Sequence, residues 1–157
     1  MKMTTLCYIE KDGAYLMLHR IKKKCDENAD KWVGIGGKFE AEESPEDCVL
    51  REIKEETGLS PKNLIYRGII TFVSDIYGTE YMHLFKAFDC LGEIKQECDE
   101  GVLEWVPKSQ VASLPLWEGD HLFLRLLEHD CPFFSLKLCY QGDHLIRAVL
   151  NREELTL

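Results

Sequence analysis

Hydrophobic positions near the N-terminus follow the pattern of β-strands. Residues 4–10 and 14–20 are rich in apolar residues, and Lys11-Asp12-Gly13 lies between them. Two such runs joined by a short turn containing glycine predict a β-hairpin. Further along the chain, the same criteria predict strands at residues 63–74, 80–90 and 102–106, and a closing hairpin at residues 132–140 and 144–150.

Local start and stop signals predict a helix from Pro45 to Thr57. Ser44 can cap the helix, proline suits the first helical position, and the acidic residues that follow favour the N-terminal end of the helix dipole. Gly58 is a natural C-terminal stop. A second helix is predicted from Leu122 to Glu128, where apolar residues recur at helical spacing.

The remaining segments predict loops and a core-facing side of the first helix. Residues 21–31 are polar and mostly charged, which predicts an exposed loop, and residues 32–39 form a short glycine-rich segment. On the first helix, one side is apolar and is expected to pack into the core through Val49, Leu50 and Ile53.

The order of these elements predicts an α/β fold, with helices packed on a mixed sheet. The chain has 157 residues, 45% of them hydrophobic and 30% charged. A chain of this length is expected to form a single domain over residues 1–157, with a core large enough to fold without disulfides.

The charge balance narrows the possible partners. The formal net charge is -9. Proteins that bind long polyanions carry basic patches, so we expect no nucleic-acid polymer as a partner. A small phosphorylated ligand is still compatible with this charge if a divalent cation lies between its phosphates and the carboxylates. No stretch approaches the length of apolar residues that a bilayer requires, so no membrane partner is expected.

The seven cysteines indicate a reducing compartment. Their number is odd, and no two of them have the C-x-x-C spacing. We therefore expect neither a disulfide framework nor a zinc site, and the cytoplasm is the simplest location.

Three acidic residues of the first helix form a candidate metal site. Glu55 and Glu56 follow Glu52 by three and four residues, so all three lie on one helical face. Their mutual repulsion would become attraction if a cation bound there, and hard oxygen ligands suit Mg²⁺ or Mn²⁺. The alternative is a solvated acidic face without a ligand.

The spacing around this helix distinguishes the two interpretations. Residues 37–59 match G-x5-E-x7-R-E-U-x-E-E-x-G-U, where U is aliphatic, at every fixed position. Seven fixed residues match by chance at a given start with a probability on the order of 10⁻⁹. This motif resembles the signature of the Nudix hydrolases. The resemblance implies an α/β/α sandwich around a mixed sheet and divalent-metal-dependent hydrolysis of nucleoside diphosphates linked to another group.

The resemblance also implies roles for individual residues. The expected metal ligands are Glu52, Glu55, Glu56 and the carbonyl oxygen of Gly37. Arg51 and Glu43 resemble the structural pair of the family, in which the arginine holds a carboxylate by a fork of hydrogen bonds.

The general base remains open between two residues. The implied reaction is in-line attack of water on phosphorus, which requires a proton acceptor. Glu52 on the helix is one candidate. Glu100, in the acidic segment 97–101, is the other, and its alternative interpretation is a solvated loop acid.

Features outside the motif favour a nucleoside triphosphate as the substrate. Residues 31–38 resemble the W-N-G-x-G-G-K run of MutT-like 8-oxo-dGTP diphosphatases, with Val33 in place of the asparagine. Residues 114–120 resemble the segment with which the mammalian 8-oxo-dGTPase holds its base, although Gly119 replaces an aspartate. Trp117 could stack on a base and Asp120 could bind its Watson–Crick edge. The alternatives are a core aromatic residue and a helix cap.

Three more residues complete the expected site. Phe72 could line the base pocket, although an aromatic residue in a strand is more often core. Lys38 and Lys23 could contact phosphates, although solvated lysines are the default.

The leading hypothesis is hydrolysis of an oxidised purine nucleotide such as 8-oxo-dGTP to the monophosphate and pyrophosphate, by a monomer or a homodimer. The alternatives are hydrolysis of ADP-ribose or a dinucleoside polyphosphate, and a nucleotide sensor without turnover.

Overall fold

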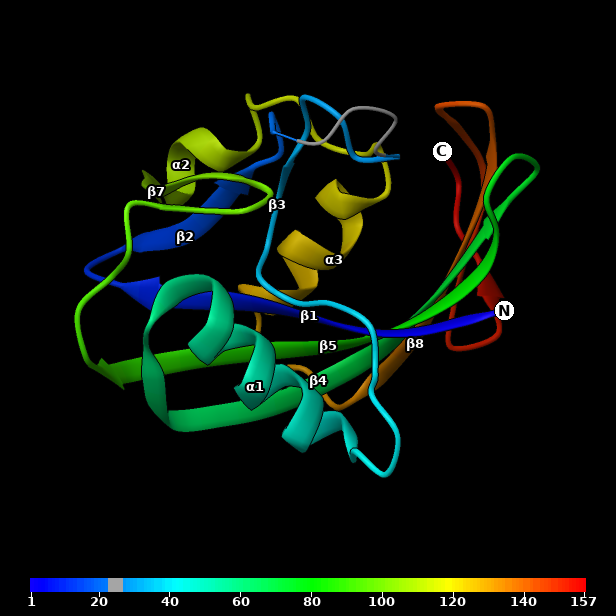
Figure 1. Ribbon diagram of the computed structural model, residues 1–157. Helices are drawn as coiled ribbons and strands as arrows, with labels where there is room; N and C mark the ends of the chain where they lie inside the picture. The colour runs from blue at the N-terminus through cyan, green and yellow to red at the C-terminus, as the bar shows by residue number, and fades with distance from the viewer. Residues whose placement is uncertain (23–26) are drawn as a thin grey trace.

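The computed structural model describes residues 1–22 and 27–157, whose strands form one mixed sheet (Figure 1). The strands are β1 (Lys2–Lys11), β2 (Ala14–His19), β3 (Trp32–Val33), β4 (Ser60–Ser74), β5 (Gly78–Leu91), β6 (Glu97–Cys98), β7 (Gly101–Pro107), β8 (Phe134–Gln141), β9 (His144–Leu150) and β10 (Glu153–Glu154). The helices are α1 (Pro45–Thr57), α2 (Lys108–Val111) and α3 (Asp120–Leu127). Every predicted strand and both predicted helices are present.

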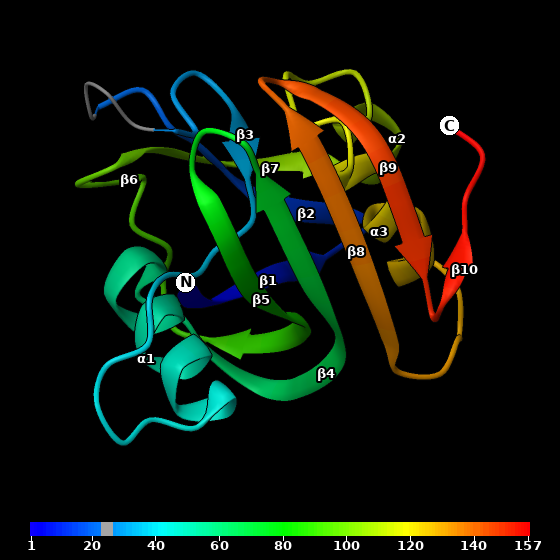
Figure 2. The same cartoon turned by 90° about the vertical axis from the view of Figure 1, so that its right-hand side faces the viewer.

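The sheet is mixed because two pairs of its strands are parallel. The strand order is β10-β9-β8-β4-β5-β1-β2-β7-β6, and β3 pairs with β2. β1 runs parallel to β5 and β4 runs parallel to β8, whereas the other pairs are antiparallel. The β8–β9 hairpin curls beside α3, as a view from the side shows (Figure 2).

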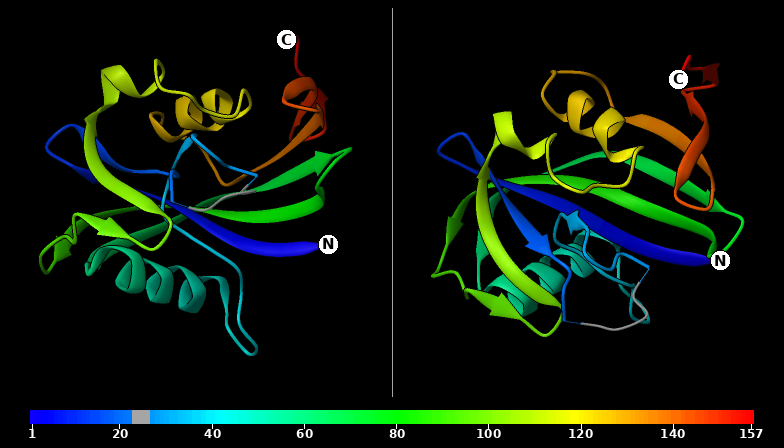
Figure 3. Two further views of the ribbon diagram at one scale, coloured as in Figure 1. Left: turned by 45° about the horizontal axis from the view of Figure 1, so that its top comes forward. Right: turned by 90° about the horizontal axis from the view of Figure 1, so that it is seen from above.

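The helices cover opposite faces of the sheet. Helix α1 lies on one face, and α3 lies on the other (Figure 3). Alternate residues of β1 pack into the two cores on opposite sides of the sheet, because successive side chains of a strand point to opposite faces. Cys7 and Ile9 join the core beneath α1, which includes Val49 and Ile53. Tyr8 joins the other core, which packs against α3.

Helix α1 begins and ends at the predicted residues. The Ser44 side chain accepts a hydrogen bond from the Asp47 backbone N–H, and Asp47 reciprocates on the Ser44 backbone N–H, so the N-terminus carries a capping box. Gly58 closes the helix with φ of 82°, a left-handed conformation that favours glycine. One expectation was wrong. Leu50 is 40% exposed, because it lies on the side of the helix that turns away from the sheet.

The start of α3 also differs from the expectation. The helix begins at Asp120, two residues earlier than predicted, with Gly119 at the N-cap position and no side-chain capping bond. Asp120 therefore does not cap this helix. The short elements α2, β3, β6 and β10 were not predicted, because two to four residues carry too little periodicity to be recognised.

The described cysteines are Cys7, Cys48, Cys90, Cys98, Cys131 and Cys139, and all are free thiols. Among the described helices, none combines the length and the apolar character that crossing a membrane would require.

Candidate active site

The glycine-rich segment packs tightly against β1 and α1. The Gly37 carbonyl accepts a hydrogen bond of 2.9 Å from the Thr5 N–H, and Ile35 exchanges backbone hydrogen bonds with Cys7. A Cβ atom on Gly36 would overlap the Thr5 carbonyl oxygen, and one on Gly37 would lie 2.5 Å from Glu52 Oε1. Glycine is therefore required at position 36 for this segment to approach the strand, and a side chain at position 37 would displace the Glu52 carboxylate.

Arg51 forms hydrogen bonds with three of the four acidic residues of the signature. It donates to both carboxylate oxygens of Glu43, from Nε at 2.7 Å and from Nη2 at 2.9 Å. The same guanidinium donates to the Lys38 carbonyl at 3.0 Å. Arg51 therefore ties the loop before α1 to the helix. Its hydrogen bonds lower the pKa of Glu43 to about 2, so that carboxylate stays charged.

The guanidinium also holds two of the expected metal ligands. Arg51 Nη1 donates to Glu52 Oε1 at 2.9 Å and to Glu55 Oε2 at 3.3 Å. These contacts offset part of the repulsion between the carboxylates of the helix.

Glu56 is directed towards Glu100 instead. Its side chain is only 6% exposed, and its Oε2 atom is buried without a hydrogen-bond partner among the described residues. Burial, followed by the charge of Glu100 and a hydrogen bond to it, raises the pKa of Glu56 to about 10. Glu100 lies at the turn between β6 and β7, with an oxygen 4.0 Å from Arg20 Nη1.

The chemistry of these residues fits a divalent cation. The helix offers carboxylate oxygens, which are the ligands that Mg²⁺ and Mn²⁺ prefer, and the unpartnered Glu56 oxygen lacks a positive partner. Within residues 1–22 and 27–157, no three His, Cys, Asp or Glu side chains stand preassembled around one point. Glu52 and Glu55 lie against Arg51 while Glu56 lies against Glu100, so these side chains do not converge.

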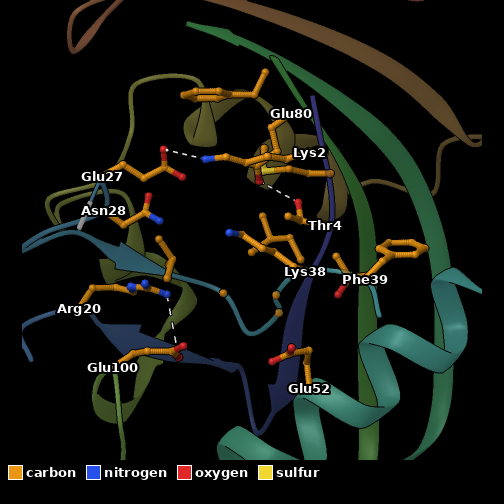
Figure 4. A pocket seen from close by; sticks show the side chains of 18 of the residues that line it. Lys2, Thr4, Arg20, Glu27, Asn28, Lys38, Phe39, Glu52, Glu80 and Glu100 are labelled. Carbon is orange, nitrogen blue, oxygen red and sulfur yellow. Dashed lines mark hydrogen bonds and ion pairs between the residues drawn. The ribbon is translucent and has the colours of Figure 1, made fainter. Parts of the chain in front are cut away.

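A cavity of about 820 Å³ extends from this helix to the opposite layer. It brings together eight of the expected site residues: Gly37, Lys38, Arg51, Glu52, Phe72, Glu100, Trp117 and Asp120. Glu52 and Glu100 lie near one end, and Lys38 points into the space above them (Figure 4). Glu43, Glu55 and Glu56 are not part of the cavity wall. Lys23 lies outside the described residues.

The far end of the cavity is aromatic. Phe72 packs edge-to-face on Trp117, with ring centroids 5.3 Å apart, and both are at most 9% exposed. Trp117 Nε1 donates to Asn28 Oδ1 at 2.7 Å, and Lys31 Nζ lies 4.7 Å from the centre of the Trp117 ring. These contacts fix the orientation of the indole. Trp117 is thus a buried aromatic residue that also lines the cavity, and its stacking on a base stays a prediction.

Asp120 is a buried carboxyl group at this aromatic end. It is 7% exposed, lines the cavity, and forms no side-chain hydrogen bond with the described residues. Burial raises its pKa to about 8, although the charge of Lys31 partly opposes the rise. At neutral pH the group is therefore mostly protonated and can both donate and accept a hydrogen bond.

The glycine before Asp120 leaves no room for a second aspartate. A Cβ atom on Gly119 would lie 2.6 Å from both Leu138 Cδ1 and Tyr140 Oη. Tyr140 Oη also accepts a hydrogen bond from the Gly119 N–H at 2.7 Å. The close packing of Leu138 and Tyr140 therefore explains why glycine, and not an aspartate as in the mammalian pattern, stands at position 119.

Several wall residues were not expected from the sequence. They include Lys2, Thr4 and Glu80, which come from β1 and β5, and Glu27 and Asn28, which come from the loop after β2. Lys2 of β1 lies opposite Glu80 of β5 in the register of the parallel strands. For the three strand residues, the only sequence signal is alternation along each strand, and it becomes informative once the pairing of β1 with β5 is known.

Comparison with known proteins agrees with this geometry. A model of the NUDIX domain matches residues 2–127. The oxidized purine nucleoside triphosphate hydrolase of Danio rerio is 34% identical over 147 residues, covering 92% of this chain and 90% of that protein. An uncharacterized Nudix hydrolase of Bacillus subtilis is 32% identical over 124 residues, covering 76% of this chain and 75% of that protein. The crystal structure of a MutT protein from Bacillus halodurans has a TM-score of 0.86 at 30% identity, covering 98% of this chain and 99% of that one.

The chain belongs to the Nudix hydrolase family. It is an enzyme of the class of pyrophosphohydrolases that act on nucleoside phosphates, and enzymes of this family generally use divalent metal ions. The predicted α/β fold with a central mixed sheet is confirmed by the likeness to the MutT protein. The roles of individual site residues remain predictions.

Proposed function

We propose that this enzyme hydrolyses an oxidised purine nucleoside triphosphate such as 8-oxo-dGTP, in the presence of Mg²⁺ or Mn²⁺, to the monophosphate and pyrophosphate. One observation carries the proposal. A single cavity connects Glu52 of the signature helix with an aromatic end that holds the buried Asp120. Such a cavity suits a ligand with phosphates at one end and a flat, polar base at the other.

Residues of the signature would hold the cation at the phosphate end. These are Glu52, Glu55 and Glu56, with the Gly37 carbonyl as a further oxygen. A divalent cation would supply neutralisation of phosphate charge and acidification of water. Because Glu56 is hydrogen-bonded to Glu100 and its pKa is raised, binding of a cation would require loss of the proton that the two carboxyl groups share. The Arg51–Glu43 pair would keep the helix and the glycine-rich segment in place.

The remaining polar residues at this end would act on water and phosphate. Glu100 faces both Glu56 and the cavity, which suits a proton acceptor, and Glu52 is the other candidate. Lys38 would contact phosphate oxygens, since its side chain points into the cavity (Figure 4). Lys23, which lies outside the described residues, is proposed for the same role.

The aromatic end would hold the base. Phe72 and Trp117 offer flat apolar surfaces, and protonated Asp120 offers an O–H donor beside a C=O acceptor. An oxidised purine presents donors and acceptors next to each other on its edges, so this residue could distinguish it from an apolar ring. The name of the zebrafish relative supports the same substrate class. The odd number of cysteines and the lack of a C-x-x-C spacing favour a reducing compartment, so the cytoplasm is the proposed location.

A substrate panel tests the proposal. The purified protein would be incubated with Mg²⁺ and a panel containing 8-oxo-dGTP, dGTP, ADP-ribose and diadenosine tetraphosphate, and products would be separated by chromatography. The proposal predicts that 8-oxo-dGTP has the highest kcat/KM and gives pyrophosphate. Preference for ADP-ribose or the dinucleotide would contradict the substrate assignment, and tight binding without products would indicate a sensor.

A further inference from the structure

Glu80 is an acidic residue of the cavity wall to which the proposed function assigns no role. It lies on β5 directly opposite Phe72 of β4, in register, and is also paired with Lys2 of β1. Residues opposite each other in a sheet point to the same face, so Glu80 shares the face of Phe72. Both side chains line the cavity.

The carboxyl group of Glu80 is held in place and has an acceptor to spare. Thr4 Oγ1 donates to Glu80 Oε2 at 2.7 Å, and the Glu80 carboxyl group forms no other hydrogen bond with the described residues. Figure 4 shows Thr4 and Glu80 joined at the side of the cavity away from Glu52. Lys2 is close by, but its ammonium group lies 3.5 Å from Glu27 Oε2 across the cavity. The second oxygen of Glu80 is therefore free to accept a hydrogen bond.

The surroundings of Glu80 favour such a bond. Burial, with a smaller contribution from the charge of Glu27, raises the pKa of Glu80. The hydrogen bond from Thr4 and the charges of Lys2 and Lys38 oppose that rise only in part. A half-buried carboxyl group with one partner is poorly solvated, so a ligand donor would compensate for the missing water. Phosphate oxygens would be repelled by the carboxylate and cannot supply that donor.

Glu80 and Asp120 line the same cavity from different elements, β5 and the start of α3. Glu80 is bonded to Thr4 of β1, whereas the charge of Asp120 contributes to the raised pKa of Tyr8 on the same strand. One carboxyl group could thus face the base while the other faces a different polar edge of the nucleoside.

We propose that Glu80 is a specificity-determining residue, whose free carboxylate oxygen accepts a hydrogen bond from a donor of the bound nucleoside, either the ribose 2′-hydroxyl or an amino group of the base. This inference rests on the proposed function, since it assumes that a nucleotide occupies the cavity. It also identifies a polar contact in a pocket where valine and glycine stand at positions 33 and 119, which can offer no side-chain hydrogen bond.

Binding of nucleoside monophosphates tests this inference without requiring turnover. GMP and dGMP differ by the 2′-hydroxyl, and dGMP and dIMP differ by the 2-amino group. Calorimetry would give Kd for the three ligands with the wild-type protein and with Glu80→Gln. The variant keeps the acceptor for Thr4 but turns an N–H donor towards the ligand. The wild type should prefer the donor-bearing member of one pair by about tenfold or more, and Glu80→Gln should abolish that preference.

Two further variants control for structure. Glu104→Gln removes an acidic group that is exposed on β7 and does not line the cavity, and it should keep the wild-type preference. Thr4→Val leaves the glutamate but removes its clamp, and it should reduce the preference without abolishing it. Thermal melting would establish that each variant is folded.

The outcomes separate this inference from the proposed function. An unchanged preference in folded Glu80→Gln, or no preference within either pair in the wild type, would overturn the role of Glu80. The pair that responds identifies the donor as sugar or base. If the monophosphates bind with the expected preference while no triphosphate is hydrolysed, the role of Glu80 stands and the proposed reaction fails.

Discussion

At the scale of single residues, burial gives two carboxyl groups of this site properties that an exposed acid lacks. Glu56 and Asp120 both have a raised pKa, of about 10 and about 8, and in both cases burial is the largest cause. Glu56 faces another carboxyl group, whereas Asp120 faces the open cavity. The first arrangement favours a cation, and the second favours a neutral hydrogen-bonding ligand.

The pKa of Asp120 predicts how stability changes with pH. The unfolded carboxyl group ionises near 3.8 and the folded one near 8, so between these values the folded state binds a proton that unfolding releases. The free energy of unfolding of the wild type should therefore contain a contribution from Asp120 that decreases as the pH rises from 4 to 8, by up to about 1.4 kcal/mol per pH unit. Above pH 8 this contribution should be constant.

The variant Asp120→Asn isolates this contribution, because asparagine does not titrate. Relative to the wild type, its free energy of unfolding should increase from pH 4 to pH 8, as measured by urea denaturation at each pH. A difference between the two proteins that does not vary with pH would contradict the raised pKa.

At the scale of elements, the site depends on how closely the glycine-rich segment approaches β1 and α1. Adjacent glycines meet different obstacles. At Gly36 the obstacle is the backbone of Thr5, which cannot move, whereas at Gly37 it is the end of the Glu52 side chain, which can. A side chain at position 36 should therefore mainly reduce stability, whereas one at position 37 should mainly reduce activity.

Alanine variants at the two positions test this difference. Gly36→Ala should destabilise the protein by about 1–3 kcal/mol, the usual cost of overpacking, because the segment must move away from β1. Gly37→Ala should stay closer to wild-type stability but lower kcat by roughly tenfold or more, because it displaces a carboxylate of the signature. Chemical denaturation and steady-state kinetics of both variants would check this, and equal stability losses with unchanged kcat would contradict it.

Elements defined by local signals were predictable from the sequence. Ser44, Pro45 and Gly58 fix α1 through capping and backbone preferences that act within a few residues. The fork between Arg51 and Glu43 was implied by the resemblance to the family signature. Predictions failed where tertiary packing decides: Leu50 is turned away from the sheet, and α3 begins two residues earlier than predicted, with Gly119 at the N-cap.

At the scale of the whole molecule, the cavity joins residues that are far apart in the sequence. Lys2, Glu80 and Trp117 line the same space, yet they come from β1, β5 and the segment before α3. Their meeting depends on the parallel pairing of β1 with β5 and on the layers on either side of the sheet. No local pattern encodes that pairing, which explains why the base end was only partly predictable and Glu80 was missed.

The central claim is that the carboxylates of α1 hold a divalent cation for hydrolysis of a nucleoside triphosphate. Its most direct test is the rate of 8-oxo-dGTP hydrolysis with and without Mg²⁺, for the wild type, Glu56→Gln and the control Glu46→Gln. Glu46 is exposed on the first turn of the same helix, at a variable position of the signature. We predict that turnover requires the metal, that Glu56→Gln lowers kcat at least ~10²-fold, and that Glu46→Gln stays near the wild type. Hydrolysis that continues without a divalent cation, or near-normal turnover by folded Glu56→Gln, would contradict the claim.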